Sequence, residues 1–268
     1  MKICIKANSG FIQFKRLWIF ALLSIANTTP AFALDIKAEI DWARRVELGT
    51  PVKGVVQHIM AQPGQRITKN EVLLQLDDRG LKSRVDGLKA QLAHFKAVLA
   101  EAEREQERAL ELYDRTVLSD HELQVAKNNL IAAEAQYEMC RTNLIQAELD
   151  LEYSSIRAPY DAVVVSRLAE VGQTVVPDLQ AITLFIVADA QHMLARGQAT
   201  AKDITQVSIG QEAMVKFDGK NYKGQIINFG LESLPKGEST EKHYFINVQF
   251  PMTSSASYIG QPAKISLP

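Results

Sequence analysis

Side chains that could bind a metal ion or act as a nucleophile are scattered along this 268-residue chain. Its histidines are His58, His94, His121, His192 and His243. None of them has the spacing to a second ligand that a zinc site requires, and the methionines are too dispersed to bind soft ions such as Cu(I). A glycine-rich phosphate loop and a Gly-x-Ser-x-Gly elbow are both missing. We therefore expect no catalytic residues, no cofactor and no metal site.

The stretch RALELYDRTVLSDHEL, residues 108–123, contains a helix start instead of a catalytic motif. Ser119 and Glu122 have the Ser-x-x-Glu spacing of a capping box, in which each side chain accepts a hydrogen bond from the other residue's backbone N–H. The residues before this point also have a helical pattern. The sequence therefore predicts two helices joined by a short turn.

Residues 78–152 are predicted to form an antiparallel coiled-coil hairpin. They contain no proline, only two glycines and many strong helix formers. Apolar residues recur every seven positions in both arms, as in the seam of a coiled coil. The seam comprises Leu81, Val85, Leu88, Leu92, Phe95, Leu99, Ala102, Gln106, Ala109 and Tyr113, then Leu123, Ala126, Leu130, Ala133, Tyr137, Cys140, Leu144, Ala147 and Leu151. Charged outer faces favour a solvated hairpin over a helix pair inside a globular core.

Two stretches on either side of this hairpin, residues 51–67 and 159–175, are similar to each other. Six of their 17 positions are identical at a constant offset, where average residue usage would give about one match. Gly64 and Gly172 occupy equivalent positions and can adopt the positive φ that a tight turn needs. The similarity favours an internal duplication of short strands over two unrelated hairpins, and the helical hairpin separates the two copies.

The C-terminal residues 190–268 are predicted to form a small β-barrel. Candidate strands lie at 193–198, 212–217, 222–230, 243–250 and 263–267, with a short helix at 200–207. Several short strands with one helix are typical of such a barrel. The segment 36–48 could supply a strand to this barrel or to the duplicated module.

The first residues predict a secretory signal peptide. Basic residues precede an apolar run at 17–26, which is followed by Ala31 and Ala33 in an Ala-x-Ala cleavage pattern. The run is shorter than the ~20 residues that a membrane-spanning helix needs. Cleavage after Ala33 would remove Cys4 and leave Cys140, which cannot form an internal disulfide on its own. We expect Cys140 to be a small core residue of an exported protein.

Together these features resemble the periplasmic adaptors, or membrane fusion proteins (HlyD/RND-type), of tripartite efflux and secretion systems. The resemblance covers essentially the whole chain after the signal peptide. It implies a mainly β fold with a long α-helical hairpin, in which residues 34–77 and 153–189 form the halves of a lipoyl-like, or barrel-sandwich hybrid, domain and residues 190–268 form a β-barrel. The membrane-proximal domain of larger adaptors is expected to be missing or minimal.

The resemblance also implies partners. Adaptors that dock on an outer-membrane channel carry Arg-x3-Leu-x6-Ser at the hairpin tip, and Arg108, Leu112 and Ser119 match that spacing. By this resemblance Leu112 would pack against an apolar notch of the channel, while Arg108 and Ser119 would form hydrogen bonds to it. The other expected partners are an inner-membrane transporter, of RND type ahead of ABC type, and further copies of the chain in a ring, with six as the family expectation. A net charge of −1 gives no basic patch for nucleic acid.

Two alternatives remain open at this stage. A carrier of a lipoyl or biotinyl group would need a lysine at the turn that joins the two half-modules, but that junction reads Leu76-Asp-Asp-Arg79 and leads into the hairpin. A purely structural coiled-coil protein of the envelope would need neither the duplicated strands nor the tip pattern.

Overall fold

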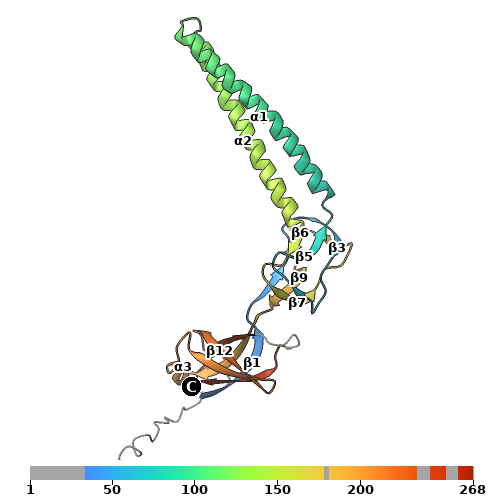
Figure 1. The fold of residues 1–268 in the computed structure, drawn as a ribbon, viewed down its shortest axis with the longest axis vertical. Helices are drawn as coiled ribbons and strands as arrows, with labels where there is room; N and C mark the ends of the chain where they lie inside the picture. Colours follow the sequence, from blue (N-terminus) through green and yellow to red (C-terminus); the bar gives the residue numbers. More distant parts are fainter. Residues whose placement is uncertain (1–33, 178–180, 234–241, 252–258, 268) are drawn as a thin grey trace, which may run out of the picture.

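The computed structural model describes residues 34–177, 181–233, 242–251 and 259–267. Three units follow one another along the long axis of the molecule: a helical hairpin, a module of eight short strands and a closed barrel (Figure 1). The predicted signal peptide lies outside the described residues. Within the described ranges, no helix combines the length and the apolar character needed to cross a membrane. The mainly β fold with a long helical hairpin confirms the fold class predicted from the sequence.

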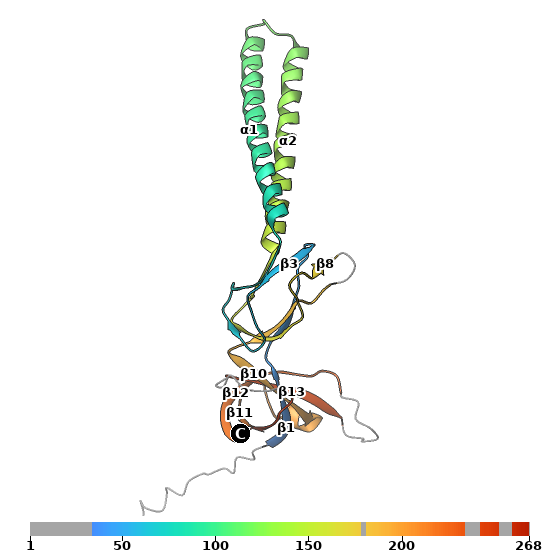
Figure 2. The same ribbon diagram turned by 90° about the vertical axis from the view of Figure 1, so that its right-hand side faces the viewer.

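The hairpin consists of α1 (Arg79–Asp114) and α2 (Asp120–Tyr153), which contact each other along their length (Figure 2). Each arm is about 50 Å long, given a rise of roughly 1.5 Å per residue. The seam residues from the heptad pattern face the opposite arm, and the most deeply buried of them are Val85, Leu123, Ala133, Cys140, Leu144 and Ala147. The Cys140 side chain is a free, buried thiol.

The middle module contains two four-stranded sheets, ordered β2-β9-β7-β4 and β6-β5-β3-β8. The first copy supplies β2 (Arg45–Leu48), β3 (Gly54–Ile59), β4 (Arg66–Ile67) and β5 (Val72–Leu76). The second copy supplies β6 (Ser155–Arg157), β7 (Ala162–Arg167), β8 (Thr174–Val175) and β9 (Phe185–Asp189). Each sheet therefore takes two strands from each copy, so neither copy can form its sheet alone.

Glycine turns join the two copies by equivalent hydrogen bonds. The Gly64 N–H donates to the carbonyl of Val164 at 2.8 Å, and the Val164 N–H donates to the carbonyl of Gln65 at 3.0 Å. Gly172 and the residue after it form the same pair of bonds with Val56. Both glycines have positive φ, at 83° and 86°, which other residues adopt only with strain. In the folded protein, each copy therefore contributes strands to both sheets, and the two copies contact each other through equivalent hydrogen bonds.

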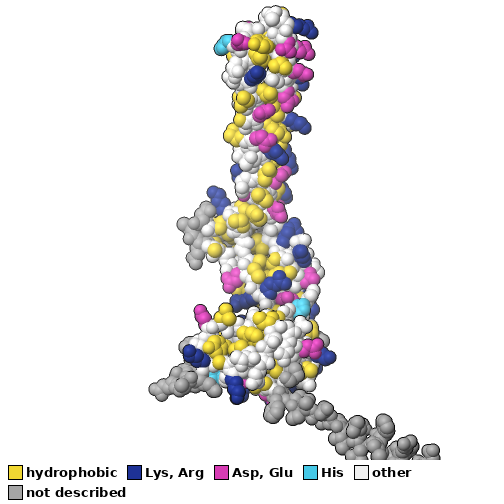
Figure 3. All heavy atoms as spheres, turned by 90° about the vertical axis from the view of Figure 1, so that its left-hand side faces the viewer, with side chains coloured by type: hydrophobic (Ala, Val, Ile, Leu, Met, Phe, Trp, Pro, Cys, Tyr) yellow, Lys and Arg dark blue, Asp and Glu magenta, His cyan; other side chains and the backbone are white. Residues whose placement is uncertain are grey.

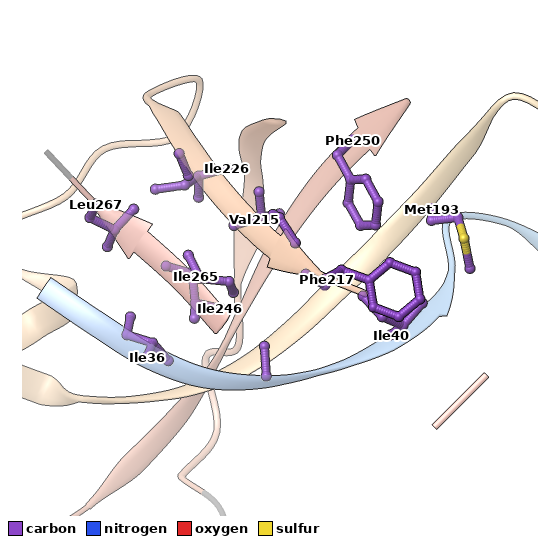
Figure 4. Packing of buried hydrophobic residues seen from close by; sticks show 14 of the residues in the cluster. Ile36, Ile40, Met193, Val215, Phe217, Ile226, Ile246, Phe250, Ile265 and Leu267 are labelled. Atoms are coloured by element: carbon purple, nitrogen blue, oxygen red, sulfur yellow. The ribbon is translucent and has the colours of Figure 1, made fainter. Parts of the chain in front are cut away.

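A closed barrel forms the other end of the molecule, with strand order β1-β10-β13-β12-β11-β14. Its elements are β1 (Leu34–Trp42), β10 (His192–Thr200), α3 (Ala201–Ile204), β11 (Glu212–Phe217), β12 (Lys220–Phe229), β13 (His243–Pro251) and β14 (Pro262–Leu267). Alternate residues of the strands point inward and meet in one apolar core, which includes Ile36, Ile40 and Phe217 (Figure 4).

The position of β1 corrects the domain boundary drawn from the sequence. Residues 34–77 are expected there to form the first half of the lipoyl-like domain, whereas residues 34–42 pair with β10 and β14 of the barrel. The module begins with β2, at residues 45–48, which pairs against β9. The physical reason is that Ile36, Ala38 and Ile40 alternate in register with the inward residues of the barrel strands.

Candidate functional site: the hairpin tip and its groove

The turn at the end of α1 is closed by its own backbone. The Thr116 N–H donates to the carbonyl of Tyr113 at 2.8 Å, and the Val117 N–H donates to the carbonyl of Leu112 at 3.0 Å. These two bonds make a Schellman motif, which normally has glycine at the position held by Thr116. Thr116 has a φ of 59°, an unfavourable value for a β-branched residue. The hairpin therefore reverses direction through a tight and strained turn.

Ser119 begins α2 with the capping box that its sequence predicts. Its hydroxyl accepts from the Glu122 N–H at 3.3 Å, and the Glu122 carboxylate accepts from the Ser119 N–H at 2.9 Å and from the hydroxyl at 2.6 Å. These hydrogen bonds lower the pKa of Glu122. The only donor of the Ser119 hydroxyl is therefore engaged within the tip, and its remaining lone pair can accept a further bond.

Arg108 and Leu112 lie one turn apart on α1 and line the same groove between the two helices. The Arg108 guanidinium is exposed and donates to Glu105 at 3.0 Å. Leu112 is half-buried. Ser119 does not line this groove, although its neighbours Leu118 and Glu122 do. The structure thus brings two of the three motif residues onto one surface and places the third at the adjoining helix start.

Tyr113 differs from the heptad prediction, which places it in the seam. Its side chain is 37% exposed, and a hydrogen bond to Asp120 raises the pKa of its hydroxyl. This bond links the end of α1 to the start of α2. The difference arises because the arms end here, so that no opposite seam residue remains to cover the ring. A short turn flanked by a tyrosine and an acidic residue is the only sequence signal of such a link.

The groove continues from the tip down one face of the hairpin and has a volume of about 530 Å³. Its lining residues are the alanines 102, 109, 126 and 133, the larger apolar residues Val98, Leu112, Leu118 and Val125, and the polar residues Glu101, Glu105, Arg108, Glu122 and Asn129. Hydrophobic side chains reach the surface along the hairpin, while charged side chains gather along one of its edges (Figure 3). The arrangement offers an apolar surface with polar margins.

Alanines of both helices line the groove, whereas the seam close to the module also contains a cluster of leucines. Close to the module, Val85, Leu144 and Ala147 form a buried cluster together with Leu88, Leu92 and Leu151. Towards the tip, alanines of both helices line the groove, while Leu123 at the start of α2 is buried. The heptad pattern predicts which face is shared by the helices, but not whether that face is filled.

The root of the hairpin is fixed to the module by buried hydrogen bonds. The Leu76 N–H donates to the carbonyl of Ser154 at 2.8 Å, and the Thr50 hydroxyl donates to the carbonyl of Tyr153 at 2.8 Å. Ser154 is fully buried. These bonds hold the end of α2 against β5 and the loop between β2 and β3.

No group of three or more metal-ligating side chains occurs among the residues that the structure describes. Comparison with known proteins matches residues 44–189 to the family described as "CzcB-like, barrel-sandwich hybrid domain". The matched range contains both copies of the duplicated strands and the whole helical hairpin.

Curated relatives and solved structures agree with this match. The chain is 25% identical to the macrolide export protein MacA of Escherichia coli O157:H7 over 79% of this chain and 61% of that protein. It is also 25% identical to the cobalt-zinc-cadmium resistance protein CzcB of Cupriavidus metallidurans over 63% of this chain and 32% of that protein. The membrane fusion protein Spr0693 of Streptococcus pneumoniae R6 shares the fold, with a TM-score of 0.66 and 13% identity over 87% of this chain and 97% of that one.

The chain spans about three fifths of the length of the macrolide export relative that it matches, 61%. The matched family covers more than half of the chain, including the hairpin and both half-modules. The chain belongs to the family with a CzcB-like barrel-sandwich hybrid domain, and so to the membrane fusion proteins, or periplasmic adaptors.

Proposed function

We propose that the protein is a non-enzymatic adaptor of a tripartite efflux or secretion system. It would link an inner-membrane transporter to an outer-membrane channel. For the transporter, the RND type is preferred over the ABC type. The membership of the family supports this role, as do the export functions in the names of the relatives, such as macrolide export for MacA. The predicted signal peptide, cleaved after Ala33, would deliver the protein to the periplasm.

The observation that carries the proposal is the position of Arg108 and Leu112 at the far end of a rigid arm. The helices carry them about 50 Å from the module, at roughly 1.5 Å per residue. Ser119 stands at the adjoining helix start with a free lone pair on its hydroxyl. An apolar side chain flanked by hydrogen-bonding groups makes a small, oriented interface. We propose that these three residues contact the channel.

A ring of adaptors would give such a small tip contact sufficient strength. Three contact residues on one tip are far fewer than the roughly 20–30 residues per partner in a stable interface. Several tips that engage one channel together would gain effective concentration without new contacts. We therefore propose that the protein works as a homo-oligomeric ring, for which the family expectation is six copies, with the exported compound passing through its centre.

Capture of the channel by the mature protein tests this proposal. Leu112→Asp places a charge on the apolar anchor and should weaken channel capture at least tenfold. Leu110→Asp is the matched control, because Leu110 lies on the same helix, is 42% exposed and does not line the groove. Circular dichroism and solution scattering of both variants should show an unchanged helix content and an elongated shape.

The results separate the proposal from a purely structural role. Loss of capture with Leu112→Asp alone supports docking through the tip. Equal capture by both variants, with the fold intact, rules out the tip contact. An added mass on a lysine of the intact mature protein would instead favour a lipoyl or biotinyl carrier.

A further inference from the structure

The barrel and the middle module meet at a narrow neck made of two antiparallel connections (Figure 1). One connection is Ala43 and Arg44, between β1 and β2, and the other runs from the end of β9 at Asp189 to the start of β10 at His192. The apolar cores of the two units are separate clusters. In the described part of the chain, no element of one unit packs broadly against an element of the other. The two connections therefore decide how the barrel is oriented relative to the module.

The two connections differ in length, and this difference bends the neck. Trp42 pairs with Met193 on the barrel side, and Arg45 pairs with Ala188 on the module side. Two residues of the first connection therefore lie opposite four residues of the second. Extra residues of this kind kink a pair of strands and leave backbone groups outside the ladder. The angle of the kink depends on what holds those backbone groups.

The carboxylate of Asp189 holds them. Its Oδ1 accepts from the backbone N–H groups of Gln191 at 2.7 Å and His192 at 3.2 Å, which fixes a turn in the longer connection. Its Oδ2 lies 3.8 Å from the Arg44 guanidinium and 3.7 Å from Nδ1 of His192. The guanidinium also stacks over the ring of Tyr160 in the module, at 4.0 Å from the centroid. One carboxylate thus shapes the longer connection and faces a cation on the shorter one.

The other end of the module, where the hairpin begins, is joined without charge. The buried polar or charged residues of the described chain are Thr50 and Ser154 at the hairpin root and Asp189 at the neck. The root is joined by hydroxyl and backbone hydrogen bonds, and its ion pair of Lys82 with Asp78 lies within α1 and its cap. At the neck, the Arg44 side chain is 58% exposed. Exposed ion pairs are weak and are screened by salt, so the neck is the joint that opens more readily.

We infer that Asp189 and Arg44 form an ionic joint that sets the angle between the barrel and the module, with Asp189 as the positioning residue. While the pair is closed, the kink is held at one angle. When the charges are screened, the barrel tilts about the neck, as in other hinges built from a few residues at the ends of elements. The hairpin keeps its direction relative to the module. The joint is a property of the single chain and does not depend on the proposed adaptor function.

Distances between pairs of spin labels test the joint on the full mature protein. Gln57→Cys with Asn221→Cys measures the barrel against the module, and Gln57→Cys with Lys96→Cys measures the hairpin against the module; all three positions are exposed. Cys140→Ala removes the native thiol. Double electron–electron resonance is recorded at about pH 8, where histidine side chains are normally neutral. High salt should broaden the module–barrel distance distribution by at least half and leave the module–hairpin distribution unchanged.

Substitutions at the neck separate the effect of charge from that of shape. Asp189→Asn keeps an acceptor oxygen for the turn but loses the charge, and Arg44→Gln removes the opposite charge. Each should broaden the module–barrel distribution in low salt as much as high salt does, and the double variant should broaden it no further, since both changes remove one pair. Arg44→Lys keeps the charge and should give a narrower distribution than Arg44→Gln. The matched control is Arg196→Gln, which removes a 3.2 Å ion pair with Asp41 inside the barrel and should change nothing.

The remaining outcomes overturn the inference. A module–barrel distribution that is equally wide in all these proteins, or that does not respond to salt, means that the pair does not hold the angle. Equal broadening of the module–hairpin distribution means that salt loosens the whole molecule. Additive broadening by Asp189→Asn and Arg44→Gln means that the two residues act separately. None of these measurements involves a channel, so their failure leaves the capture test with Leu112→Asp unaffected, and failure of that test leaves the joint unaffected.

Discussion

The root and tip halves of the hairpin share one heptad pattern but differ in how completely the space between the helices is filled. In the root half, large side chains such as Leu144 fill the seam and form a buried cluster. In the tip half, alanines of both helices line an apolar groove that is open to solvent. The same repeat thus accompanies a filled seam at one end and an open groove at the other.

The largest expected effect on stability comes from shortening one leucine side chain in each half of the hairpin. Leu144→Ala removes a root side chain that is 9% exposed, and should lower the stability of the hairpin by about 2–5 kcal/mol through lost burial and a new cavity. Leu118→Ala, at the half-buried edge of the groove, should cost much less because little packing is lost there. Hydrogen exchange of the hairpin amides measures both changes. Equal losses would mean that the tip is packed as tightly as the root.

Enlarging an alanine tests the same contrast in the opposite direction. Ala147 is 1% exposed within the root cluster, so Ala147→Leu should destabilise the hairpin by about 1–3 kcal/mol through overpacking. Ala126→Leu extends into the groove and should be close to neutral in stability. Urea unfolding followed by the helix signal compares the two variants. A strongly destabilised Ala126→Leu protein would contradict the presence of usable space at the tip.

Relieving the strain in the turn should have a smaller effect on stability, and this effect should be confined to the tip. Thr116 occupies the left-handed position of a Schellman motif at φ 59°. Thr116→Gly should therefore stabilise the tip by about 1 kcal/mol, since glycine adopts this conformation without strain. Exchange rates of amides near residue 116 should fall, while those near the root stay unchanged. Slower exchange at both ends would show that the turn and the root are coupled.

Much of this architecture follows from the sequence for a physical reason. Helical periodicity reports which side of a helix is buried, so most of the seam from Leu81 to Leu151 could be located, with Tyr113 as an exception. Six identical positions at a constant offset predicted the duplication, and they include Gly64 and Gly172, whose positive φ few other residues tolerate.

Other features depend on relations that one sequence does not encode. The alternation in residues 34–42 shows a half-buried strand, but not which sheet completes it. Alanines such as Ala109 are compatible both with a close approach of the helices and with a space left between them. The groove, the main candidate site beside the tip motif, was therefore not predicted, although Arg108 and Leu112 within it were.

The smallest expected effect is a difference in acid sensitivity between the two ends. Hydrogen bonds from Ser119 hold the pKa of Glu122 at the tip below its ordinary value of 4.5. At the root, hydrogen bonds from Arg79 lower the pKa of Asp77 from 3.8 to about 2. A carboxylate whose pKa is lower in the folded state contributes its full stabilisation above its unfolded pKa and loses it as the pH falls through the folded pKa.

Acidification below pH 4.5 should therefore weaken the cap of α2 before it affects the start of α1, whose Asp77 stays largely ionised until the pH approaches 2. Exchange of amides after Ser119 should accelerate first, relative to the intrinsic rate at each pH. Glu122→Gln keeps the acceptor of the capping box but cannot titrate, so the acid response of the tip should disappear in that variant while the response of the root remains. If amide exchange at the tip of the Glu122→Gln variant still accelerates over the same pH range, another group controls the acid response and the capping carboxylate is not its source.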